Sequence, residues 1–388
     1  MSITNTDLNY VAGTYRRFPV EIVSGKGSVF CGADGKEYVD MGSGIGVNIF
    51  GVNDEAWKAA VTDQLNKVQH TSNLYYTEPC GRLAEALCQK TGMKKVFFSN
   101  SGAEANECAV KVARKYAAEK KGSDCFTIVT LKNSFHGRTL TTLSATGQEH
   151  YHELFQPLTP GFVSVAAEHP EELEELAKTT KIAAVLMECI QGEGGVIALS
   201  GEYVSFLRRF TAENDILLIV DEVQTGNGRT GKLYAYMNYG IEPDVVSTAK
   251  GLGGGLPIGA TLLSEKVQHV LGFGDHGSTY GGNPVSCAGA CSVISRLDDG
   301  FLAEVARKGT LLRDLFADVP EIEEISGMGL MIGLKTKKKA ADVVRICMEN
   351  GILCLTANDK VRLLPPLNTP DELLVKAAEV IIHACKEA

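Results

Sequence analysis

A lone lysine, Lys250, stands in the stretch "DVVSTAKGLGGGLPIGA" at positions 244 to 260. A short apolar run containing Val245 and Val246 precedes it and reads as a buried strand, and a run of glycines follows it. A charged amine is costly to desolvate at the end of a buried strand. Three explanations are therefore open: the amine reaches water, it binds an anion, or it takes part in chemistry.

An acid occupies a comparable place earlier in the chain. Asp221 comes directly after "LLIV", at the expected carboxyl end of another apolar strand, and Lys250 follows 29 residues later. A carboxylate in that position should have a cationic partner. Either the two residues form a buried ion pair, or both bind one ligand. In the second case the acid holds a cationic ring nitrogen and the lysine forms an imine, as in pyridoxal phosphate sites.

Two further strand ends carry residues that fit the same ligand. Ser101 and Gly102 follow "KVFFSN" and precede a helix, where free N–H groups favour a phosphate, although a plain N-cap also explains the serine. Phe135 and Arg138 share the loop after "FTIVTL". There they supply a stacking ring and a carboxylate clamp, or they belong to an ordinary surface loop.

Acidic residues follow one more apolar run, "AAVLME". Glu188 ends this run and Glu193 lies in the "CIQGEGGV" segment that comes next. One explanation is a buried, paired carboxylate beside a solvated one. The other is that this strand end also faces the ligand, because ligands of parallel sheets bind at the carboxyl ends of the strands.

A metal ion and a nucleotide are the competing ligands. His136, His150 and His152 are candidate metal ligands, but no further His, Cys or Glu spacing completes a site, so no metal is expected. The segment "GNGRTGK" at 226–232 matches both G-x-G-x-x-G and G-x-x-x-x-G-K. However, Leu233 stands where a P-loop needs Ser or Thr, and the glycines do not directly follow a strand. Binding of pyridoxal phosphate would explain the residues found at four strand ends, whereas binding of a nucleotide would explain those at only one.

The elements that must position these residues alternate along the chain. From about residue 55 to 290, the apolar runs "KVFFSN", "FTIVTL", "AAVLMEC", "LLIVD", "DVVST" and "GATLL" are separated in several places by amphipathic helical stretches. This alternation predicts an α/β fold with a mainly parallel sheet flanked by helices. We expect a large domain over residues 51–298 and a smaller α+β domain over 299–388. Residues 1–50 are expected to contribute to the small domain.

The bulk composition narrows the possible partners. The 388 residues carry a formal charge of −9, with 44% hydrophobic and 22% charged residues, an ordinary globular balance. The acidic excess argues against nucleic acid or an anionic membrane as a partner. No signal peptide is visible and no apolar run approaches the roughly 20 residues that span a bilayer. The eleven cysteines contain no C-x-x-C, so reduced thiols and a cytoplasmic location are expected.

Seven segments occur in one order along the chain: "NSGAEANE", "FHGRT", "QGEGGV", "DEVQTGNGRTGK", "AKGLGGGLPIGA", "HGSTYGGNP" and "RLLPPL". Together they resemble the class III, fold type I family of pyridoxal-phosphate-dependent aminotransferases, from about Tyr15 to the C-terminus. The resemblance implies a seven-stranded type of sheet and a homodimer with shared active sites. It also implies that Lys250 is the imine-forming lysine. The glycines that follow Lys250 would let the chain turn tightly beside the cofactor.

The resemblance assigns roles around the cofactor and the substrates. The cofactor residues that it implies are Ser101, Gly102 and Ala103 at the phosphate, Phe135 on the ring face, Asp221 at the ring nitrogen, Gln224 at the ring hydroxyl, Lys250, and Thr279 reaching in from the neighbouring subunit. Tyr15 and Arg138 would clamp the α-carboxylate of the amino donor. Glu193 and Arg362 would form a pair that opens so that Arg362 can bind 2-oxoglutarate.

The implied reaction is a ping-pong transamination from N-acetyl-L-ornithine to 2-oxoglutarate, a step of arginine biosynthesis. N-succinylornithine, ornithine and 4-aminobutyrate are alternative donors. The chain departs from the family pattern in three places: "GVNDE" at 51–55 replaces Gly-His-x-x-Pro, Cys189 stands where proline is usual, and Ser326 where arginine is common. These departures leave the donor less certain than the type of reaction.

Overall fold

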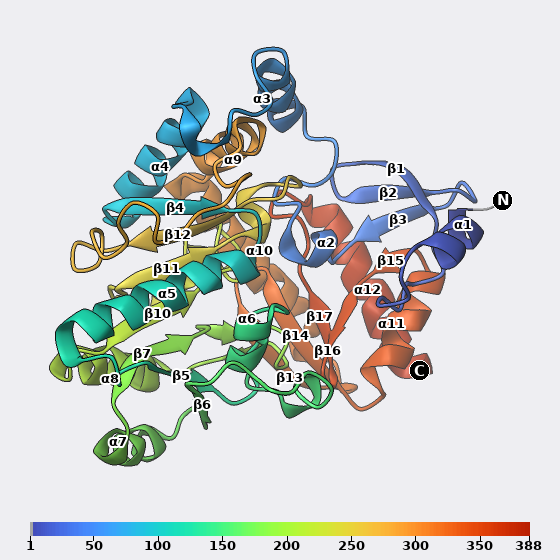
Figure 1. Ribbon diagram of the computed structural model, residues 1–388. Helices are drawn as coiled ribbons and strands as arrows, with labels where there is room; N and C mark the ends of the chain where they lie inside the picture. The colour runs from blue at the N-terminus through green and yellow to red at the C-terminus, as the bar shows by residue number, and fades with distance from the viewer. Residues whose placement is uncertain (1–2) are drawn as a thin grey trace.

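The computed structural model describes residues 3–388 and is built around a seven-stranded sheet (Figure 1). One strand of this sheet, β12, runs antiparallel to both of its neighbours, and the other strands are mutually parallel. In spatial order the strands are β4 (Lys95–Ser99), β12 (Gly259–Leu263), β11 (Val245–Thr248), β10 (Leu217–Asp221), β7 (Ile182–Met187), β5 (Thr127–Leu131) and β6 (Phe162–Val165). The predicted α/β class and mainly parallel sheet are confirmed.

The central strands are apolar throughout because both faces of the sheet are covered. In β10, alternate residues from Leu217 to Val220 belong to two separate apolar clusters, and both clusters also contain residues of β7. One cluster contains α5 (Gly102–Lys121), whose buried Ala109 and Ala113 let the helix lie close to the sheet. The other contains residues of α4 (Glu78–Thr91), α8 (Gly201–Glu213) and α9 (Pro284–Arg296). Both faces therefore bury side chains, as expected for a parallel sheet.

Strand β6 is the one strand of this sheet that the apolar runs do not predict. It has four residues at the edge of the sheet, and its first three are not fully buried. A short edge strand with one covered face shows no continuous apolar run, so the pattern used for the central strands does not apply to it.

The C-terminal part has its own antiparallel sheet, in the order β13 (Ile322–Met328), β14 (Met331–Thr336), β17 (Lys360–Leu363) and β16 (Leu355–Ala357). Its helices are α10 (Asp299–Ala317), α11 (Ala340–Glu349) and α12 (Asp371–Glu387). The N-terminal strands β1 (Ile22–Lys26), β2 (Val29–Gly32) and β3 (Glu37–Asp40) form a third sheet with β15 (Ile352–Leu353).

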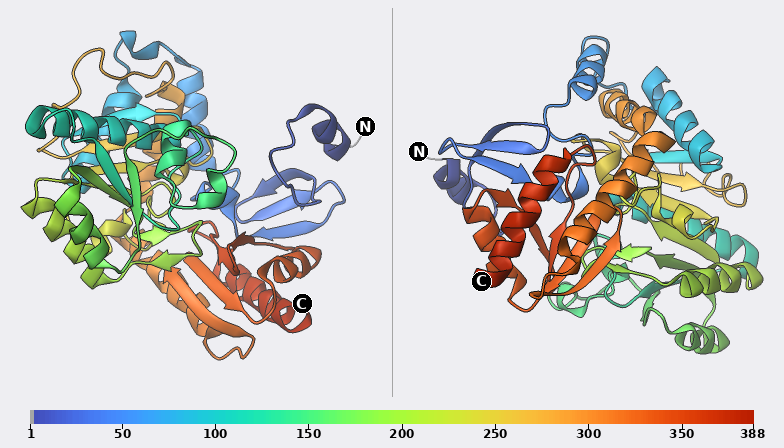
Figure 2. Two further views of the ribbon diagram at one scale, coloured as in Figure 1. Left: turned by 60° about the horizontal axis from the view of Figure 1, so that its bottom comes forward. Right: turned by 180° about the vertical axis from the view of Figure 1, so that it is seen from behind.

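Strands β3 and β15 pair in parallel, so the N-terminal segment and the C-terminal part share a sheet. Figures 1 and 2 show the N-terminal strands beside α11 and α12. This pairing supports the division into residues 1–50, 51–298 and 299–388, which stays a prediction. The remaining helices are α1 (Ile3–Tyr10), α2 (Ser43–Gly46), α3 (Glu55–Leu65), α6 (Leu140–Ala145) and α7 (Pro170–Thr179). In residues 3–388 no helix is both long and apolar enough to cross a membrane.

Candidate active site

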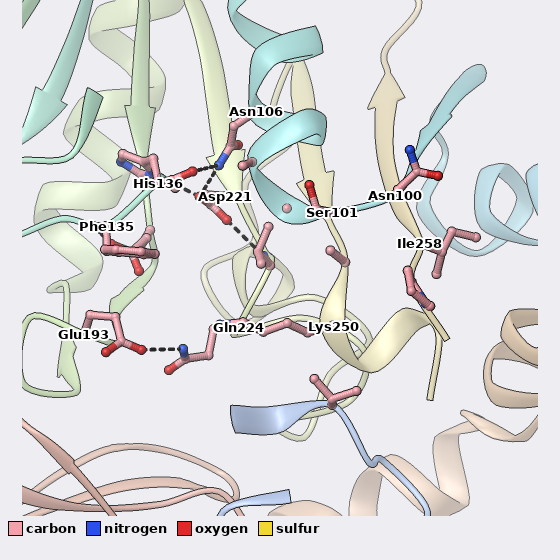
Figure 3. Close-up of a pocket in the computed structure, with 18 of the residues that line it drawn as sticks. Asn100, Ser101, Asn106, Phe135, His136, Glu193, Asp221, Gln224, Lys250 and Ile258 are labelled. Carbon is pink, nitrogen blue, oxygen red and sulfur yellow. Dashed lines mark hydrogen bonds and ion pairs between the residues drawn. The ribbon is translucent and has the colours of Figure 1, made fainter. Parts of the chain in front are cut away.

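A cavity of about 380 Å³ lies at the carboxyl ends of the sheet strands and gathers most of the predicted residues (Figure 3). Those that line it are Ser101, Gly102, Ala103, Phe135, Glu193, Asp221, Gln224 and Lys250. His136 and Glu188, considered from the sequence without a settled role, line it as well. The strand ends of β4, β5, β7, β10 and β11 thus meet at one place, as the topology requires.

Asp221 ends β10 with a buried carboxylate that receives three donors. Its Oδ2 accepts from Asn106 Nδ2 at 2.7 Å and lies 2.8 Å from His136 Nδ1. Its Oδ1 accepts from the backbone N–H of Val223 at 3.0 Å. The expected partner was a cation, with Lys250 as one candidate; the structure supplies His136 and a neutral amide instead. These donors replace the water that burial removes.

Asn106 and Val223 contact Asp221 at this site, and the sequence did not single out either residue. Asn106 carries the more specific contact. It lies on α5 and is itself held by Ser247 Oγ, which donates to its Oδ1 at 2.6 Å. Its Nδ2 also donates to the carbonyl of His136 at 2.9 Å. The available signal was its spacing of four from Gly102 in "NSGAEANE", which places it on the same helix face one turn further on.

One residue, Ala249, separates Lys250 from the end of β11, and Lys250 begins a short 3-10 turn, η4 (Lys250–Leu252). Its backbone φ is +45°, a region that non-glycine residues seldom adopt. Among the hydrogen bonds and ion pairs of residues 3–388, its amine makes none. Burial lowers the pKa of Lys250, against the opposing effect of Glu193. The ion pair with Asp221 that the sequence allowed is absent from the described part of the chain.

The N-terminus of α5 forms the opposite wall of the cavity. Ser101 is its N-cap, with Oγ accepting from the N–H of Glu104 at 3.2 Å. The amides of Gly102 and Ala103 belong to the first helical turn and have no acceptor within the helix. A Cβ at Gly102 would lie 2.6 Å from Cγ1 of Val223, so only glycine allows this approach of helix and loop. The N-cap role and the anion site predicted for Ser101 are therefore compatible.

Glu193, Gln224 and Arg362 form a polar triangle at the edge of the cavity. Arg362, on β17, donates from Nη1 to Glu193 Oε1 at 2.6 Å and from Nη2 to Oε2 at 3.3 Å. Gln224 joins both: its Nε2 donates to Glu193 at 3.2 Å, and its Oε1 accepts from Arg362 at 3.0 Å. Burial would raise the pKa of Glu193, but the Arg362 guanidinium outweighs it and the pKa lies below its usual value.

Four predicted residues lie outside the lining of this cavity: Arg362, which reaches it only through Glu193 and Gln224, and three exposed residues. Arg138 is exposed, with its guanidinium carbon 4.2 Å from the ring centroid of Tyr151 and 5.4 Å from that of Phe135. Tyr15 is 73% exposed and stacks under Arg17. Thr279 is exposed on the loop before α9. The roles given to these three residues stay predictions.

The chemistry of the lining matches pyridoxal phosphate. Asp221, Phe135 and Val223 all line the cavity, so the carboxylate could hold a cationic ring nitrogen and the two apolar side chains could contact a flat ring. Helix amides are free to meet a phosphate. The amine of Lys250 is free to form a covalent bond with an aldehyde. In residues 3–388 no cluster of three or more His, Cys, Asp or Glu side chains is arranged to hold a metal ion.

Comparison with known proteins gives a consistent result. The family model for class-III aminotransferases matches residues 10–385. The acetylornithine aminotransferase of Haemophilus ducreyi is 49% identical over 387 residues, 99% of this chain and 98% of that protein. The ornithine aminotransferase of Toxoplasma gondii, a structure with pyridoxal phosphate partly occupying the active site, has a TM-score of 0.94 at 34% identity, over 98% of this chain and 93% of that one. The N-acetylornithine aminotransferase of Stenotrophomonas maltophilia has a TM-score of 0.87 at 32% identity, over 99% of both chains.

Glu222, the neighbour of Asp221, is completely buried and is absent from the cavity lining. Its carboxylate accepts from Thr225 Oγ1 at 2.6 Å and from the N–H of Tyr236 at 2.8 Å. Burial raises the pKa of Glu222 to about 7 from its ordinary value of 4.5. Between these two pH values the folded chain keeps a proton that the unfolded chain releases, so the free energy of unfolding falls as the pH rises.

Replacement Glu222→Gln should remove this pH dependence. A glutamine oxygen can accept from Tyr236 while its NH₂ donates to the Thr225 hydroxyl, so the two contacts survive. Relative to the wild type, the variant should gain about 2–3 kcal/mol of unfolding free energy at pH 8 and nothing near pH 4. Denaturant unfolding of both proteins at the two pH values measures the difference. A difference that does not change with pH would show that folding does not raise the pKa of Glu222.

Proposed function

Since the chain belongs to the class-III aminotransferase family, we propose that it moves the terminal amino group of N-acetyl-L-ornithine to 2-oxoglutarate. The products are N-acetyl-L-glutamate 5-semialdehyde and L-glutamate, in arginine biosynthesis. The observation that carries the proposal is that Lys250, whose amine has no hydrogen-bond or ion-pair partner in residues 3–388, shares one cavity with a fully hydrogen-bonded Asp221 and with Glu193, which pairs with Arg362 beside the cavity. The proposal agrees with the names of two similar proteins, the acetylornithine aminotransferases of Haemophilus ducreyi and Stenotrophomonas maltophilia.

Pyridoxal phosphate supplies an electron sink for the carbon that bears the transferred amine. In our proposal Asp221 holds the ring nitrogen protonated, Phe135 and Val223 bound the ring, and Gln224 donates to the ring hydroxyl. Ser101, Gly102 and Ala103 bind the phosphate at the start of α5. Lys250 holds the cofactor covalently between turnovers. Cys189 and Ser326, two of the departures from the family pattern, are absent from the cavity lining.

Lys250 is the group that moves the proton. Because burial lowers its pKa, a larger share of its amine is neutral and able to act as a base. Once the donor's terminal amine has displaced it, Lys250 Nζ takes a proton from the donor carbon that bears that amine. In the second half of the reaction, it returns a proton to the corresponding carbon of 2-oxoglutarate.

One site must bind two different substrates, each through its α-carboxylate: the amino donor and 2-oxoglutarate. We assign the donor's α-carboxylate to Tyr15 and Arg138, and the 2-oxoglutarate α-carboxylate to Arg362. Arg362 is almost fully buried, with 4% of its side chain exposed, and Glu193 neutralises it. Glu193 therefore masks Arg362 while the donor binds, and it must release the guanidinium for 2-oxoglutarate.

The proposed assembly is a homodimer with shared sites, in the cytoplasm. Support for the dimer comes from Thr279, which is exposed and outside the cavity of its own chain. Near it, Tyr280 and Leu74 to Tyr76 expose large apolar surfaces, and Asn73 bonds the Ser278 carbonyl at 3.0 Å, which brings the two segments together. A second copy of the chain would cover these side chains and bring Thr279 to the partner's phosphate site.

A donor panel tests the proposed function. With 2-oxoglutarate fixed, kcat/KM should be highest for N-acetylornithine, about tenfold or more above that for N-succinylornithine, ornithine or 4-aminobutyrate. The kcat/KM for free ornithine should be low because its α-ammonium group must approach the Arg138 guanidinium that binds the neighbouring carboxylate. The measurement is glutamate formation under equal conditions. If another donor on the panel is preferred, the reaction type stands and the assigned substrate is wrong.

Replacement Glu193→Ala should unmask Arg362. The free guanidinium would then bind α-carboxylates of ordinary amino acids, so glutamate should gain about tenfold against N-acetylornithine as the donor. Glu193→Gln keeps the shape of the side chain but not its charge. Its preference for glutamate over N-acetylornithine should lie between those of Glu193→Ala and the wild type. Single-turnover rates of each half-reaction, followed by the cofactor's absorbance, measure the preference. If the ratio of the glutamate rate to the N-acetylornithine rate is unchanged in Glu193→Ala, the masking role is wrong and Tyr15 and Arg138 alone determine which donor is preferred.

A further inference from the structure

Trp57 is the only tryptophan in the chain, and it follows the "GVNDE" segment that departs from the family pattern. It lies in the first turn of α3, where the N-cap Asp54 accepts from its backbone N–H at 2.9 Å. Asp54 also pairs with Arg296 of α9 at 2.9 Å. The backbone of Trp57 is therefore fixed between α3 and α9.

The indole of Trp57 lies against two glycines that leave room for it. A Cβ at Gly254 would be 3.0 Å from Nε1, and one at Gly289, in α9, would be 2.9 Å from the same atom. From this position Nε1 donates to the carbonyl oxygen of Gly253 at 3.0 Å. A residue 196 positions earlier thus holds the glycine turn that comes after Lys250.

That turn connects directly to the backbone of Lys250. The N–H of Gly253 donates to the Lys250 carbonyl at 3.1 Å, and the Gly253 carbonyl also accepts from Leu256 at 3.3 Å. On the other side, Asn227 Nδ2 donates to the carbonyl of Ala249 at 3.2 Å. Lys250 has a left-handed backbone, which persists only where the surroundings hold it. The hydrogen bond from Asn227 holds the backbone just before Lys250, and the hydrogen bond from Trp57 holds the turn just after it.

The glycine turn also has open space on two sides. Gly255 lines the main cavity and, together with Trp57 and Gly254, a second cavity of about 150 Å³. Gly253 is buried and Gly255 is exposed between the two cavities, so the hydrogen bond to the Gly253 carbonyl holds the turn at the point where its packed part ends. Simple packing of α3 on α9 would need the indole ring but not its N–H group.

We propose that Trp57 is a positioning residue for Lys250, acting through its indole N–H on the Gly253 carbonyl. The inference rests on the proposed function, in which Lys250 holds the cofactor. Loss of the N–H should loosen the segment from Lys250 to Leu256 and expose the lysine–cofactor bond to attack. Overall folding should hardly change.

The test uses the fact that one tryptophan is present. Growth on benzothienylalanine, a tryptophan analogue with sulfur in place of N–H, changes this one position while keeping its shape. In the holoenzyme, hydrogen–deuterium exchange of peptides covering residues 250–256 should be about fivefold faster, the effect of one lost hydrogen bond. Hydroxylamine should also strip the cofactor from Lys250 about fivefold faster, as followed by absorbance. Trp57→Phe should give the same changes.

The matched control is Val61→Ala. Val61 lies on α3, and its Cγ2 would be 3.3 Å from a Cβ at Gly289, so it packs on the same glycine without touching the turn. It should lower the melting temperature and leave both rates at the wild-type values. Wild-type rates in the analogue protein, or equal changes in Val61→Ala, would overturn the role of Trp57.

Borohydride reduction of the wild-type holoenzyme keeps the two proposals apart. Mass spectrometry should find the reduced cofactor on the peptide that contains Lys250. If it is absent there, the proposed function fails before Trp57 is changed. If it is present and the analogue protein keeps wild-type rates, only the role of Trp57 fails.

Discussion

Asp221 ends a strand in which all five residues are buried, and a carboxylate there needs hydrogen-bond donors in place of water. The three donors come from different parts of the fold: Asn106 from α5, His136 from the loop after β5, and Val223 from the loop that Asp221 itself begins. Each hydrogen bond to a charged group contributes about 1.5–3 kcal/mol. The position of this carboxylate therefore fixes how α5 and two loops are placed around the cavity.

The arrangement leaves Lys250 free. Had Asp221 and Lys250 paired, the amine would be held protonated and the carboxylate would be occupied. Instead, neutral and imidazole donors satisfy Asp221, and burial lowers the pKa of Lys250. Charge pairing occurs at the edge of the cavity, between Glu193 and Arg362, where Gln224 bonds both. The site thus separates a fixed negative charge, a free amine and a masked positive charge.

The sequence predicted the parts of this site that depend on local pattern. A lone acid or amine after an apolar run identified Asp221 and Lys250, and the helix start after β4 identified Ser101 and Gly102. It could not predict the partners of Asp221. His136 is 85 residues away, and it meets Asp221 because the sheet order β10–β7–β5 brings the two strand ends within reach across β7. Asn106 and Trp57 act through contacts of the same long range, and nothing in their local sequence shows an acceptor.

The central claim is that the Asp221 carboxylate, held by its three donors, supplies the charge that keeps the cofactor's ring nitrogen protonated. Asp221→Asn keeps the size of the side chain and removes that charge. The most direct measurement is the single-turnover rate of the donor half-reaction in this variant, with the cofactor shown by its absorbance to be bound. A rate lower by about 100-fold or more is expected for the loss of such an electrostatic contact. A rate close to that of the wild type would make Asp221 a purely structural residue and contradict the account.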